Sequence, residues 1–139
     1  RSPAGAIGVM QLLPNTGASL DVGDITELDA NIHAGTKYLS TLMDSGQAGE
    51  QLDPLNRLYF ALASYNAGQT RIRRLRRQAE RQGLDPNLWH DNVELLVARE
   101  IGRETVQYVD NIYKYYLAYS LATRQEMIHQ QEREKQDLN

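Results

Sequence analysis

The spacing of apolar residues is the feature that most constrains how this chain can fold. Through most of the 139 residues, apolar side chains recur every three or four positions, and Val, Ile and Thr never form an alternating run. A spacing of three to four places side chains on one side of a helix, whereas strict alternation would indicate a strand. The pattern therefore predicts an all-α fold and indicates no strand.

Two helices are marked by start and stop signals. Asp53-Pro54 opens the better delimited one, because the carboxylate can accept from free backbone N–H groups and proline suits the first helical position; Asn66-Ala67-Gly68 ends it. Asp29 is predicted to cap the helix before it, and Gly46 to end that helix. The predicted inward residues of that earlier helix are Ile32, Tyr38, Leu39, Leu42 and Met43.

The second half of the chain predicts two more helices. One covers residues 70–82, with Ile72, Leu75 and Ala79 inward and its arginines outward, and Gly83 closes it. Trp89 is expected to anchor the following loop, and a long final helix begins near Arg103 and runs into a polar tail over residues 130–139 that frays.

The opening residues are rich in glycine and alanine. Residues 5–13 are predicted to form a short helix stopped by Pro14, and residues 15–20 a second short helix. Small residues allow close approach of the backbone, which suits a groove that offers amides and hydroxyls to sugar hydroxyl and acetamido groups. Gln11, Ser2 and Thr16 could supply the polar contacts.

Composition excludes several classes of site. The net charge of −3 gives no global field that favours nucleic acid or an anionic membrane. The chain has no cysteine, and its three histidines show no metal-ligand spacing, so neither a metal site nor a cofactor is predicted. No apolar run approaches the ~20 residues that span a bilayer.

Four motifs resemble those of the soluble-type (SLT) lytic transglycosylases. Gly8-Val9-Met10-Gln11 resembles the family's Gly-Leu-Met-Gln, and Ser64-Tyr65-Asn66-Ala67-Gly68 resembles its Ala-Tyr-Asn-Ala-Gly. Residues 31–39 resemble Asn-Ile-x-x-Gly-x-x-Tyr-Leu, and residues 104–109 resemble Glu-Thr-x-x-Tyr-Val. The stretch 108–116 is similar to the membrane-bound type F branch, which is fused behind a periplasmic solute-binding-like domain.

The resemblance implies a lysozyme-like (goose-type) helical domain over residues 1–120, followed by a polar helical tail over 121–139. The family's catalytic glutamate stands in a Glu-Ser pair whose serine matches Ser2, so we expect it before Arg1, together with the first helix of the domain. We therefore expect no catalytic residue in this chain, no turnover by it, and self-association through the apolar surface that the first helix would cover. The carboxylates that could substitute by type, none of them favoured, are Glu27, Glu50, Glu94, Glu100 and Glu104.

The family's reaction uses a single glutamate. It protonates the glycosidic oxygen between N-acetylmuramic acid and N-acetylglucosamine, then assists attack by the substrate's own 6-hydroxyl, which gives a 1,6-anhydro product. The resemblance thus implies peptidoglycan glycan strands as partner, the bacterial periplasm or cell envelope as location, and no nucleic acid. The substrate contacts that it implies here are Ser2, Gln11, Leu13, Thr16, Tyr65 and Asn66, with Met10 and Tyr108 as further candidates.

Two other functions stay open at this point. One is a noncatalytic glycan-binding module that keeps the groove without the acid. The other is a helical nucleic-acid-binding or scaffold protein that uses the arginine-rich segment 71–77, although arginines above inward Ile72 and Leu75 are ordinarily the solvated face of a helix.

Overall fold

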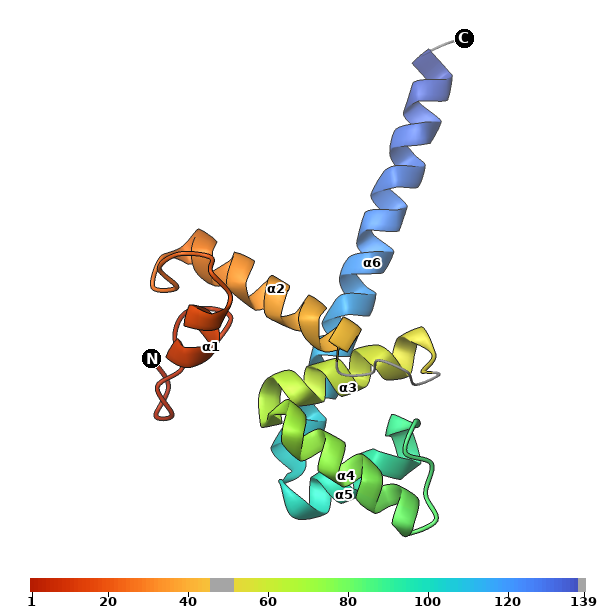
Figure 1. Ribbon diagram of the computed structural model, residues 1–139. Coiled ribbons are helices and arrows are strands. Elements are labelled where there is room, and N and C mark those ends of the chain that lie inside the picture. The colour runs from red at the N-terminus through yellow and green to blue at the C-terminus, as the bar shows by residue number, and fades with distance from the viewer. Residues whose placement is uncertain (46–51, 138–139) are drawn as a thin grey trace.

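The chain folds as a set of helices with α3 (Pro54–Ala67) at the centre. The computed structural model describes residues 1–45 and 52–137, and within them there is no strand, only one isolated bridge. The prediction of an all-α fold is confirmed. The other elements are α1 (Pro14–Ser19), α2 (Leu28–Ser45), α4 (Gln69–Arg81), η1 (Trp89–Val93), α5 (Glu94–Glu100) and α6 (Arg103–Asp137). Helices α2, α4, α6 and η1 contact α3, whereas α1 lies beside α2 (Figure 1).

The main core lies between α3, α4, α5 and the first turns of α6. Trp89 is fully buried, and its ring meets that of Phe60 edge-on with the centroids 5.8 Å apart. Leu75, Val97 and Val109 fill the same core. The predictions that Trp89 anchors its loop and that Leu75 faces inward are confirmed.

The start of α3 is the predicted one. The Asp53 carboxylate accepts from the backbone N–H groups of Leu55 and Asn56, both at 3.0 Å, and Pro54 takes the first helical position. Bonds from the Asn56 side chain and backbone hold the pKa of Asp53 below its usual value. The helix ends at Gly68, whose φ of 93° is one that residues other than glycine rarely adopt.

The prediction of a helix over residues 5–13 is wrong. The opening residues form two tight turns, the first over residues 2–6 and the second over residues 7–12, where backbone bonds between Ile7 and Leu12 close it. Gly5, Gly8 and Gln11 all have positive φ, which a right-handed helix cannot contain. Glycine adopts such values at little cost, so the residues that suggested a punctuated helix form turns instead. The short helix that follows is α1, close to the predicted 15–20.

Helix α2 differs from its prediction in two respects. It begins at Leu28, so Asp29 lies in the first turn and is not the cap. Ile32, predicted inward, is 44% exposed, while Asn31 beside it is 1% exposed. The inward side of this helix thus includes a polar residue, Asn31, which accepts from the Met10 N–H of the opening loop. The predicted end at Gly46 lies outside the described residues.

Helix α4 buries one of the arginines that were expected to face outward. Arg76 donates from Nε to the Pro86 carbonyl and from Nη2 to Asn87 Oδ1, both at 2.7 Å. Its guanidinium also lies 4.5 Å from the centre of the Phe60 ring. This arginine therefore fixes the loop after α4 and is not part of a solvated basic face.

The distal half of α6 projects away from the other helices (Figure 1). Its exposed apolar side chains include Tyr116, Tyr119 and Leu121. The helix continues through the segment 130–137 of the predicted polar tail. Among the described helices, none is both long and apolar enough to cross a membrane. Self-association stays a prediction.

Core packing predicts the response to a matched pair of substitutions. Leu75 is fully buried on α4, whereas Leu95 on α5 is 51% exposed. We expect Leu75→Ala to lower the free energy of unfolding by about 2–5 kcal/mol, because the transfer term and the residual cavity add. Leu95→Ala should change it by no more than about 0.5 kcal/mol. Urea denaturation followed by Trp89 fluorescence measures both, and equal effects would contradict this assignment of the core.

Candidate functional site

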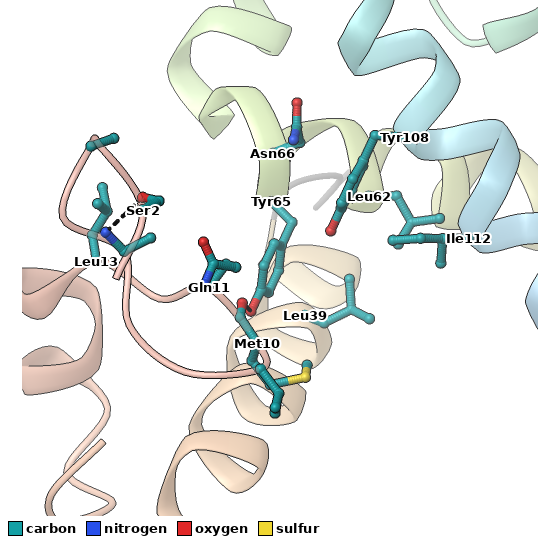
Figure 2. A pocket seen from close by; sticks show the side chains of 13 residues that line it. Ser2, Met10, Gln11, Leu13, Leu39, Leu62, Tyr65, Asn66, Tyr108 and Ile112 are labelled. Carbon is teal, nitrogen blue, oxygen red and sulfur yellow. Dashed lines mark hydrogen bonds between the residues drawn. The ribbon is translucent and has the colours of Figure 1, made fainter. Parts of the chain in front are cut away.

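A cleft of about 610 Å³ lies between the opening loop and helices α2, α3 and α6 (Figure 2). Figure 2 shows Met10 and Gln11 coming from the loop, Tyr65 reaching toward them from α3, and Tyr108 standing on α6. Seven of the residues predicted for the site line this cleft: Ser2, Met10, Gln11, Leu13, Tyr65, Asn66 and Tyr108.

The eighth predicted residue, Thr16, lines an adjoining hollow of about 230 Å³. The two hollows are adjacent, because they share four lining residues: Gln11, Leu13, Tyr65 and Asn66. The structure therefore brings together all eight residues that the sequence suggested, from segments that lie more than 90 positions apart at their extremes, Ser2 and Tyr108.

The loop wall owes its shape to Gly8 and Gln11. The Gln11 backbone N–H and its side-chain amide both donate to the Gly8 carbonyl, at 3.1 and 2.8 Å. Gln11 has φ of 49°, in the left-handed region that a non-glycine residue enters at a cost. These local bonds offset that cost and present the exposed Gln11 side chain at the cleft.

Tyr65 joins the loop to α3. Its hydroxyl donates to the Met10 carbonyl at 2.7 Å, and its ring lies 5.2 Å from that of Tyr38. Burial, with smaller contributions from Tyr108 and Tyr38, raises the pKa of Tyr65 to about 12, so the phenol is neutral at ordinary pH. Because its proton is committed to Met10, the hydroxyl can only accept from a ligand. A role for Tyr65 in orienting an acid or an acetamido group stays a prediction.

Asn66 and Ser2 each have one polar atom engaged within the protein. Asn66 Oδ1 accepts from the Thr105 hydroxyl at 2.8 Å, which leaves the side-chain NH2 as the group that Asn66 can offer. Ser2 Oγ accepts from the Ala6 N–H at 3.0 Å, and its own O–H can donate (Figure 2). Asn66 and Ser2 thus each present a donor at the rim of the cleft.

The inner wall is apolar, and sequence reasoning did not identify it. Leu39, Leu62 and Ile112 line it. A signal was present: Leu62 lies three residues before Tyr65 and Ile112 four after Tyr108, spacings that put each pair on one side of its helix. Polar donors beside apolar wall are what a neutral sugar ring with hydroxyl and acetamido groups requires.

No acid is contributed by the described residues that line the cleft. Neither hollow has an Asp or Glu among them. Glu94 accepts from the Asp91 N–H, Glu100 accepts from the Gln78 side chain, and Glu104 lies in the first turn of α6. Glu50 lies outside the described residues. Glu94, Glu100 and Glu104 are therefore engaged or located outside the cleft.

Comparison with known proteins matches most of this chain to one family. The family model of the Transglycosylase SLT domain matches residues 1–87. Curated relatives named membrane-bound lytic murein transglycosylase F include those of Shewanella frigidimarina, 33% identical, and Desulfosudis oleivorans, 37% identical, each aligned over 84% of this chain. The alignments cover 27% and 28% of those proteins, so the chain spans about a quarter of their length.

The bond between Tyr65 and Met10 can be tested by removing one oxygen. We expect Tyr65→Phe to lower the free energy of unfolding by about 1–3 kcal/mol, because the half-buried Met10 carbonyl loses its donor. Tyr119→Phe, at a side chain 74% exposed on α6, is the matched control and should change nothing measurable. Urea denaturation of the three proteins gives the comparison; a Tyr65→Phe protein as stable as the parent would show that this bond contributes no net stability.

Proposed function

The chain belongs to the Transglycosylase SLT domain family, and from this we propose that it forms the substrate cleft of a peptidoglycan lytic transglycosylase. The observation that carries the proposal is the meeting of Gln11 and Tyr65 in one cleft that no charged described residue lines. The names of the relatives, murein transglycosylases of the membrane-bound type, support the same substrate and a place in the bacterial cell envelope, for which we propose the periplasm.

The proposed ligand is a glycan strand of alternating N-acetylglucosamine and N-acetylmuramic acid. Asn66, Gln11 and Ser2 offer donors to its hydroxyl and acetamido oxygens. Leu13, 48% exposed, and Val9, 66% exposed, give the apolar faces of the pyranose rings a surface to contact. Binding of this kind depends on shape and hydrogen bonds, not on charge.

The proposed reaction is a non-hydrolytic cleavage. A carboxylic acid gives its proton to the glycosidic oxygen as the bond from that oxygen to the anomeric carbon of the muramic residue breaks. The 6-hydroxyl of the same residue then bonds to that carbon and returns its proton to the carboxylate, so no water is consumed. Classed by its chemistry, the enzyme is a lyase.

The role of this chain in that reaction is to bind and orient the strand. Because no described residue of the cleft is a carboxylate, we propose that the chain alone does not turn over substrate and that the acid comes from a segment outside residues 1–139. The same observation favours a second candidate, a noncatalytic glycan-binding module. The nucleic-acid alternative finds no such support, since Arg76, one of the five arginines of the segment 71–77, is buried over the Phe60 ring and the net charge is −3.

Binding is expected to depend on the Asn66 amide. Asn66→Asp keeps the acceptor for Thr105 but replaces the donor NH2 by a carboxylate oxygen. We expect the affinity for the neutral oligosaccharide (GlcNAc)4 to fall about tenfold, the equivalent of one lost hydrogen bond. Gln107→Glu makes the same chemical change at an exposed position outside the cleft and should leave the affinity unchanged. Calorimetric titration measures the affinity of both variants. Equal affinities would show that the Asn66 amide does not contact the ligand.

Turnover is expected only when an acid is supplied. Incubated with purified sacculi, the chain alone should release no 1,6-anhydro-muropeptides detectable by chromatography and mass spectrometry. A chimera in which the segment before the matched serine of the Shewanella frigidimarina relative is fused to the chain should release them. Release by the chain alone would overturn the proposal that it lacks its acid, and release of reducing ends by the chimera would identify a hydrolase instead.

A further inference from the structure

Asn31 is a buried polar residue on the inward side of α2, at only 1% exposure. Its Oδ1 accepts from the Met10 N–H at 2.9 Å, and its Nδ2 donates to the carbonyls of Ile7 and Ile25 at 3.0 and 2.8 Å. Both amide hydrogens are thus used, and all three partners are backbone groups. A buried amide satisfied in this way fixes the segments that it joins.

The surface of α2 around Asn31 is shaped to receive the opening loop. A Cβ on Gly8 would lie 2.4 Å from the Asn31 amide, so only glycine allows the loop to approach this closely. One turn along α2, a Cβ on Gly35 would lie 2.6 Å from the Met10 side chain. Asn31 and Gly35 of α2 therefore hold the same stretch of loop. Asn31 holds it by hydrogen bonds, and Gly35 allows it to pack closely.

The backbone of Met10 is held at both ends. Its N–H donates to Asn31, and its carbonyl accepts from the Tyr65 hydroxyl at 2.7 Å. The next residue is Gln11, which carries the loop's polar side chain into the cleft. The line from Asn31 through Met10 to Tyr65 thus connects α2 to α3 beneath the cleft and sets the separation of its two walls.

We propose that Asn31 is a positioning residue of the cleft, one that touches no ligand but fixes the Met10–Gln11 wall against which the ligand lies. The proposal rests on the proposed function for the identity of that ligand. Asn31 is not among the residues that line either hollow, so its effect on binding can reach the ligand only through the loop.

The organisation of the core explains why this role differs from general stabilisation. Ile7, Leu12, Leu20, Ile25 and Ala34 form a small cluster separate from the main core around Phe60 and Trp89. Loosening Asn31 acts on the small cluster and its loop, and leaves the main core packed. Local opening of this kind has its own free energy, below that of global unfolding.

The test compares Asn31→Asp with Ala34→Gly in the full chain. Asn31→Asp keeps the size of the side chain, removes both donors and sets a carboxylate oxygen against the carbonyls of Ile7 and Ile25. Because these oxygens repel one another, the carboxylate has to move away from the place where it accepts from the Met10 N–H. Ala34→Gly weakens the same helix and the same small cluster without touching a loop hydrogen bond. Amide hydrogen exchange of Met10, followed by nuclear magnetic resonance, reports the loop. Titration with (GlcNAc)4 reports the cleft, and urea denaturation followed by Trp89 fluorescence reports the main core.

We expect Asn31→Asp to speed exchange of the Met10 amide at least tenfold and to weaken (GlcNAc)4 binding at least fivefold. Ala34→Gly, at a similar urea midpoint, should do neither. Gly8→Ala provides a second variant that displaces the loop from its own side and should release the same Met10 amide, should Asn31→Asp fail to fold.

Two results would overturn the proposal: a Met10 amide as protected in Asn31→Asp and Gly8→Ala as in the parent, or Asn31→Asp binding (GlcNAc)4 as the parent does. If the parent chain itself shows no affinity for (GlcNAc)4, the proposed function fails, while Met10 exchange still decides whether Asn31 fixes the loop. The two claims are therefore separable within one set of measurements.

Discussion

The cleft depends on one hydrogen bond, from the Tyr65 hydroxyl to the Met10 carbonyl. It joins residues 55 positions apart and links the opening loop directly to α3. The opening loop has no regular secondary structure to hold its shape, so its position comes from what it is bonded to. With Asn31 on the other side of Met10, the loop becomes a fixed wall although its own backbone includes a left-handed residue, Gln11.

The two apolar clusters of this chain support different segments, and the main core also includes Leu62 of the cleft wall. The main core around Trp89 lies among α3, α4, α5 and α6, away from the loop, whereas the small cluster around Ile7 and Leu12 supports the loop alone. Helix α3 belongs to both parts, since Phe60 faces the main core and Tyr65, five residues on, faces the cleft. Helical spacing places these two side chains on different sides of one rigid element, so the core fixes one wall of the cleft directly.

The sequence allowed the regular parts of this structure to be predicted, and its irregular parts much less well. Helix α3 was predicted correctly at both ends because Asp53-Pro54 and Gly68 act through local chemistry. The prediction of a helix over the opening loop is wrong because the conformation of the loop depends on a bond to Asn31, more than 20 positions away. Arg76 was misplaced for the same reason: its partners Pro86 and Asn87 are ten and eleven residues on, in a loop. The residues predicted for the site came from family motifs, which record long-range contacts that periodicity does not show. Leu39, Leu62 and Ile112 of the apolar wall are not among those predicted residues.

The apolar wall bears on the chemistry that the proposed function requires. A general acid must hold its proton near neutral pH, and a carboxyl group with an ordinary pKa of about 4 does not. Two physical effects raise that value, removal of water and a nearby negative charge, while a nearby cation lowers it. The cleft offers an apolar surface without a nearby cation, because Leu39, Leu62 and Ile112 line it and no Lys or Arg is among the described residues that do. A carboxyl group brought against this wall would therefore have a raised pKa without needing a second carboxylate, which is the condition under which one acid, used in turn as acid and base, is sufficient.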